Sequence, residues 1–264
     1  MAPDYVGNFT VSEGRIVVTA VGALGHDDIG TVTVAADAAL VNQYVGHDAS
    51  SGKLFHIAGT GYVDCIDNRN YCPISGTFVL DADATFYSGG PDRAGLGFHQ
   101  STFDLNGHVL TFSKAKWSTT ALTDVLFTNR SEQAATVQSS GNSLRYVLTR
   151  VTFAGGPQNQ FAPSSAMVTI NSVTSDWTLL QSSAYTLTLL TPNRATMGNS
   201  LDYRWDGPVS IERDLTADNT VDIGEPSASV SALTFGGLVT STIPATRLQF
   251  TGFCNILDSA NFAK

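Results

Sequence analysis

The chain has 264 residues and is acidic, with 14 lysines and arginines against 23 aspartates and glutamates and a formal net charge of −9. A chain of this length can bury a real core, as one large domain or as two of ordinary size. The acidic balance, without any basic run, argues against a nucleic-acid groove and against an anionic membrane surface as partner. No apolar stretch is long enough for a spanning helix, so we expect no membrane insertion.

Residues 1–7 contain neither a basic region nor an apolar stretch, so we expect no signal peptide in the chain as given. The chain is then either used without export by this route or is a mature form that begins with a restored methionine.

Six segments predict β-strands because they are rich in β-branched and aromatic residues, several with alternating polar and apolar positions. The best helical candidate is the short segment 37–44. Turn clusters of Gly, Asn, Asp, Pro and Ser separate the segments. The expected strands are residues 15–21, 31–34, 53–57, 108–112, 144–153 and 185–189.

Asn106-Gly107 is the strongest turn signal, because both residues accept the positive φ of a type I′ hairpin turn. Many short strands with such turns predict an all-β fold with very little helix. We expect antiparallel strands in a β-sandwich, jelly roll or barrel. We recognise no convincing internal repeat.

The segment 154–165 contains two prolines and two glycines and interrupts the strand pattern. It predicts a boundary between a β domain at residues 1–154 and a second at 155–264. The alternative is a long loop within one large all-β domain.

All five histidines, at positions 26, 47, 56, 99 and 108, precede this boundary. His26 and His47 each stand in a Gly-His-Asp triplet, and a histidine beside a carboxylate suits metal binding or general-base chemistry. The glycines place both triplets in turns, where such side chains are commonly solvated. Asp81 and Asp83 would lie about 7 Å apart on one face of an extended segment, a separation found in glycosidases but also in any strand with this spacing.

The familiar motifs of nucleophilic hydrolases, phosphate-binding loops and zinc proteases are absent from the sequence. We therefore assign no catalytic residue and lean towards a protein that is not an enzyme.

Cys65 and Cys72 flank a polar hexapeptide and could face each other across a short hairpin at disulfide distance. Cys254 lies in an apolar run and is expected to be a buried thiol. Asn8-Phe-Thr10 and Asn129-Arg-Ser131 match the acceptor pattern for N-linked glycans, a pattern that a chain rich in Ser and Thr also produces by chance.

The segment 214–225 resembles the twelve-residue calcium loop of EF-hand proteins, since it offers oxygen ligands at positions 1, 3, 5, 7, 9 and 12. Asn219 replaces the usual glycine at position 6, and Pro226 follows where the family continues a helix. The alternative is an acidic surface loop that satisfies its own backbone. If calcium is the cofactor, its ligands are Asp214, Thr216, Asp218, the carbonyl of Thr220, Asp222 and Glu225.

Composition and these absences favour a non-enzymatic structural or adhesive component of a particle or surface, such as a virion capsid, decoration or tail protein. We expect it on a virion or an extracellular surface, as a homo-oligomer or bound to other structural subunits. The apolar run 248–257 would then be buried against other subunits or a sister domain.

The first alternative is a secreted, calcium-dependent, carbohydrate-binding β-sandwich that would need exposed aromatic rings to stack on a glycan. The second is a β-barrel enzyme that uses His26 or His47. The rings available to the first alternative are Trp117, Trp177 and Trp205.

Overall fold

In the computed structural model, the described part of the chain consists of β-strands joined by turns and short connections. No described residue is helical, so the expectation of an all-β chain with very little helix is confirmed there, and no described helix could cross a membrane. The described residues are 5–19, 23–24, 29–42, 53–58, 62–65, 72–88, 96–114, 119–140, 145–163, 167–181, 188–190, 204–205, 208–211, 220–223, 233–235, 239–241, 247–250, 254–256 and 262–263.

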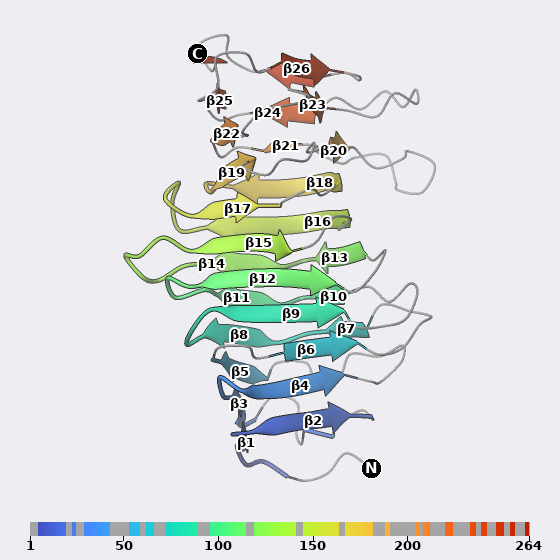
Figure 1. Ribbon diagram of the computed structural model, residues 1–264, viewed down its shortest axis with the longest axis vertical. Coiled ribbons are helices and arrows are strands. Elements are labelled where there is room, and N and C mark those ends of the chain that lie inside the picture. Colours follow the sequence, from blue (N-terminus) through green and yellow to red (C-terminus); the bar gives the residue numbers. More distant parts are fainter. Residues whose placement is uncertain are drawn as a thin grey trace.

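The architecture is a parallel β-solenoid, in which the chain winds in coils that stack along one axis (Figure 1). Each coil places one or two strands in a 14-stranded sheet and one in an 11-stranded sheet, and every described strand pair is parallel. The prediction of an antiparallel sandwich, jelly roll or barrel is therefore wrong. Each strand pairs with its counterpart one coil away, not with the next strand along the chain.

The first sheet runs through β1 (Phe9–Val11), β3 (Thr31–Val34), β5 (Leu54–Ile57), β8 (Thr77–Leu80), β11 (Thr102–Asp104), β14 (Leu126–Thr128), β16 (Arg145–Ala154), β18 (Met167–Ser175), β20 (Thr188–Leu190), β23 (Thr220–Ile223) and β26 (Arg247–Phe250). A side branch of this sheet, β7 (Cys72–Ile74), β10 (Leu96–His99) and β13 (Thr119–Thr123), joins it at β16.

The second sheet runs through β2 (Gly14–Val18), β4 (Ala38–Asn42), β6 (Tyr62–Cys65), β9 (Ala84–Ser88), β12 (Val109–Lys114), β15 (Thr136–Ser140), β17 (Gln160–Ala162), β19 (Thr178–Gln181), β22 (Val209–Ile211), β25 (Val239–Ser241) and β28 (Phe262–Ala263). A third sheet contains β21 (Arg204–Trp205), β24 (Leu233–Phe235) and β27 (Cys254–Ile256).

A column of five stacked phenylalanines forms the centre of the core. The pairing of the first sheet aligns Phe55, Phe78, Phe103, Phe127 and Phe153 on successive coils. Neighbouring rings are nearly parallel, with centroids 4.7, 4.8, 5.0 and 4.9 Å apart, and all five are at most 1% exposed. Offset stacking adds to the stability that burial of the ring area provides.

These five residues also reveal the internal repeat that we did not recognise in the sequence. Successive phenylalanines are 23, 25, 24 and 26 residues apart. Because the coil length varies, the repeat has no fixed period, although the alternation of buried and half-buried residues within β3, β5 and β8 is regular.

The turn at Asn106-Gly107 has the predicted local geometry but a different role. Both residues have positive φ, 50° and 82°, and His108 N donates to Leu105 O at 2.8 Å. The turn does not form a hairpin, since it leads from β11 in the first sheet to β12 in the second. A Cβ atom on Gly107 would lie 2.8 Å from Ser131 Oγ in the next coil, so close stacking also requires glycine.

Two other local expectations are wrong because strands pair between coils and not with the next strand along the chain. The helix candidate 37–44 contains strand β4, which pairs with β2 and β6. The hairpin expected between Cys65 and Cys72 does not form, because β6 pairs with β4 and β9 whereas β7 pairs with β10. The sulfur positions lie outside what the structure describes.

Strand pairing continues across the predicted boundary at residue 154. In the first sheet β16 pairs with β18, and in the second β15 pairs with β17. The division into two domains stays a prediction, beside the single-domain alternative.

Shortening one ring of the stacked column should destabilise the fold strongly. Phe127→Ala removes a buried side chain that packs on Phe103, Phe153 and Trp177, so we expect a loss of about 3–5 kcal/mol of unfolding free energy. The control is the adjacent Leu126→Ala, which is 36% exposed on the other face of β14 and should cost about 1 kcal/mol or less. Denaturant unfolding of both variants measures the difference, and equal losses would contradict the stacked core.

Candidate functional site

The ion pairs between described side chains lie at two corners of the solenoid. We call the first the Asp81 corner, where the chain passes from the first sheet to the second; it comprises Asp81, Asp83, Asp104 and Asn106 with His56 and His108. The second is the Asp124 corner, where the chain passes from the side branch to the first sheet; it comprises His99, Gln100, Asp124 and Arg150.

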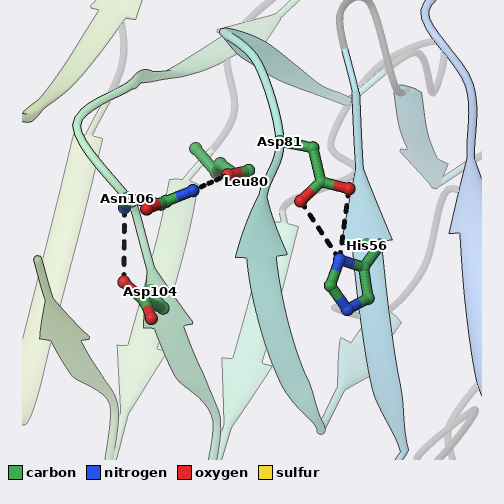
Figure 2. Close-up of polar contacts among 5 residues, drawn as sticks. All are labelled: His56, Leu80, Asp81, Asp104 and Asn106. Atoms are coloured by element: carbon green, nitrogen blue, oxygen red, sulfur yellow. Dashed lines mark hydrogen bonds and ion pairs between the residues drawn. The ribbon is translucent and has the colours of Figure 1, made fainter. Parts of the chain in front are cut away.

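At the Asp81 corner, the chain bends directly after β8, and the two aspartates engage different neighbours. His56 Nδ1 lies 3.1 Å from both carboxylate oxygens of Asp81 (Figure 2). Asp83 accepts a hydrogen bond from Val109 N at 2.9 Å and lies 3.6 Å from His108 Nδ1. Asp81 therefore binds the preceding coil and Asp83 the following one. The two carboxylates do not face one common partner, as the paired carboxylates of a glycosidase would.

The next coil continues the corner with polar contacts to the backbone. Asn106 Nδ2 donates to Leu80 O at 3.3 Å, and Asn106 N donates to Asp104 Oδ1 at 3.2 Å (Figure 2). Arg130 Nε lies 3.3 Å from Asp104 Oδ2, so this corner is also fastened by an ion pair between adjacent coils.

At the Asp124 corner, one backbone geometry recurs on three successive coils. Gln100, Asp124 and Arg150 have φ values of 48°, 54° and 51°, in the left-handed region that residues other than glycine rarely adopt. Gln100 N donates to Thr123 O and Asp124 N to Thr149 O, so the first two of these residues are bonded to the next coil. At Arg150 the bend falls inside β16, whose first half pairs with β13 and second half with β14.

The side chains at this corner form a charged group of three. Arg150 donates from Nε to Asp124 Oδ1 at 2.5 Å and from Nη2 to Oδ2 at 2.7 Å, and His99 Nε2 lies 3.8 Å from Oδ2. The hydrogen bonds from Arg150 lower the pKa of Asp124; its charge and that of His99 act in the same direction, whereas desolvation opposes them. The same hydrogen bonds raise the pKa of Arg150.

These arrangements fasten coils to one another, and we assign them no catalytic chemistry. Each histidine–aspartate pair is substantially exposed, as for His56 and Asp81 at 34% and 42%, so water screens the charges. Among the described residues, no group of three or more His, Cys, Asp or Glu side chains could hold a metal ion.

A buried lysine, Lys53, binds the backbone on either side of the segment 25–28 in the sequence. Lys53 is 1% exposed, and its Nζ donates to Leu24 O at 2.8 Å and Ile29 O at 3.0 Å. These carbonyls flank residues 25–28, which include His26 and lie outside the described residues, as does His47. The sequence pattern gave no sign that Lys53 is buried.

The predicted calcium ligands fall mainly outside what the structure describes. Thr220 and Asp222 lie in β23, which pairs with β20 and β26. The remaining candidates, Asp214, Thr216, Asp218 and Glu225, are not among the described residues. Calcium binding therefore stays a prediction.

The described tryptophans do not provide the exposed rings that the glycan-binding alternative expected. Trp177 and Trp205 are 0% exposed and both pack on Phe153, with centroids 5.4 and 5.5 Å away. Trp117 lies outside the described residues.

Comparison with known proteins assigns neither a family nor a function to the chain. No protein-family model, curated protein or solved structure matches the chain.

Removing the arginine of the charged group should change stability in a pH-dependent way. Because the pKa of folded Asp124 is lowered, its pairing stabilises the fold above the ordinary carboxyl pKa, and this contribution is lost as pH falls through the lowered value. Arg150→Gln should therefore cost about 0.2–1 kcal/mol near neutral pH, and the cost should vanish in acid. Unfolding measured across pH tests this, with Arg15→Gln on edge strand β2 as the control; a cost that does not depend on pH would contradict the pairing.

Calcium, if it binds, should raise the melting temperature. Four carboxylates in one short loop repel each other without a cation, so the ion would stabilise the folded chain by roughly 2.7 kcal/mol when free calcium is a hundred times its dissociation constant. Thermal melting with calcium or a chelator, on the wild type and on Asp214→Ala, provides the measurement. The absence of a shift in the wild type would identify 214–225 as an ordinary acidic loop.

Proposed function

We propose that this chain is a non-enzymatic structural or adhesive component of a particle or surface, such as a virion capsid, decoration or tail protein, and that it works as a homo-oligomer. The observation that supports this most is the parallel ladder with the stacked column from Phe55 to Phe153 at its centre. Bending the solenoid would pull apart hydrogen-bonded strands and stacked rings at the same time, so the solenoid resists bending.

The two corners add a second reason for a mechanical role. Ion pairs between His56 and Asp81, Asp104 and Arg130, and Asp124 and Arg150 each join adjacent coils. Individually such exposed pairs contribute little. Repeated along the axis, they favour one relative rotation of neighbouring coils, which suits a protein that presents a fixed surface.

The carbohydrate-binding alternative is not supported by a specific contact. Two of the three tryptophans that it required, Trp177 and Trp205, are committed to the core. A glycan partner would have to be recognised by other side chains.

Native mass and localisation test the proposal together. Sedimentation velocity should give a species heavier than the 27.9 kDa monomer, and hydrogen exchange should slow in residues 248–257 when the protein assembles. Immunogold labelling of cells and particles from the source should place the protein on a particle or surface. A strictly monomeric protein found free in the cell interior would overturn the proposal.

A further inference from the structure

The two N-linked acceptor motifs occupy opposite environments in the folded chain. Asn129-Arg-Ser131 lies at the Asp81 corner, in the coil after Asn106, and Asn8-Phe-Thr10 lies at the first strand of the first sheet. The two asparagines can therefore differ in whether their amide nitrogen can accept a sugar in the folded protein.

Asn129 is part of the core and its amide is fully engaged. It is 8% exposed; Nδ2 donates to Gln133 O and to Asn159 Oδ1, both at 2.7 Å. Oδ1 accepts from Gly107 N at 2.9 Å and Ser131 N at 3.1 Å. Attaching a sugar to Nδ2 would replace one of its two hydrogens and so remove one of these donated bonds. It would also require space inside the solenoid, which a close-packed interior does not offer.

Asn8 is exposed, and among the described residues its side chain is bonded through the amide oxygen. Oδ1 accepts from Thr31 N at 2.9 Å, which orients the side chain, while no described residue accepts from Nδ2. Thr10 is exposed as well, and among the described strands β1 pairs only with β3, so the motif lies at an edge of the described sheet.

From this contrast we infer that Asn8 is an acceptor site for an N-linked glycan on the folded protein and that Asn129 is not. The Asn8 amide nitrogen attacks the anomeric carbon of a glycosyl donor activated by a diphosphate. The new C–N bond forms as the C–O bond to the diphosphate breaks, the diphosphate leaves with the bonding electrons, and the amide loses one proton to a base of the transferase. The inference is independent of the proposed structural role.

The test treats the folded full-length protein with a soluble N-glycosyltransferase and uridine diphosphate glucose, followed by intact-mass and peptide mass spectrometry. One hexose should be added, on Asn8. Two synthetic peptides, spanning residues 5–13 and 126–134, should both accept the sugar, because neither is protected by the fold.

Matched variants separate the two motifs. Asn8→Gln and Thr10→Val should abolish the addition, Thr10→Ser should retain it, and Ser131→Ala, which removes the second motif but keeps Asn129, should leave it unchanged. A folded protein that stays unmodified while the 5–13 peptide accepts the sugar would overturn the inference. So would a hexose on Asn129 of the folded chain.

Discussion

The parallel hydrogen-bond ladder between successive coils is the constraint on which the other features of the molecule depend. It places each residue beside the residue at the same position of the next coil. The side chains at one position must therefore pack well against each other along the axis. The column from Phe55 to Phe153 satisfies this condition because flat rings spaced near 4.8 Å stack well. A polar group in such a column needs a partner one coil away, as Asn129 has in Asn159.

The same constraint governs the corners. A bend that one coil makes must be made by the next at the same place, or the ladders on both sides lose register. Gln100, Asp124 and Arg150 therefore repeat one left-handed conformation, although none is a glycine and each carries a backbone cost of about 1–2 kcal/mol. The hydrogen bonds from Arg150 to Asp124 help to offset that cost at the corner where it arises.

Charge placement on the outside follows from stacking as well. Like charges on adjacent coils would repel at close range, whereas Arg150 and Asp124 attract and His56 Nδ1 lies within hydrogen-bond distance of Asp81. Such pairs are about 25 residues apart in the sequence, at a distance where no helix or hairpin rule would associate them. For this reason the sequence alone does not pair Asp124 with Arg150.

The sequence by itself determined the all-β class, several strand positions and the geometry of one turn, because these depend on neighbouring residues. Residues 31–34 alternate in burial as their pattern predicts, and Asn106 and Gly107 adopt positive φ. It did not determine which strands pair, since alternation specifies which face is buried and is the same for parallel and antiparallel partners. Only the tertiary structure decided that the Asn106-Gly107 turn changes sheets instead of reversing the chain, that Trp177 is buried, and that Asn129 is engaged while Asn8 is exposed. Each of these depends on contacts between coils more than twenty residues apart, and the variable coil length leaves no fixed period from which to read them.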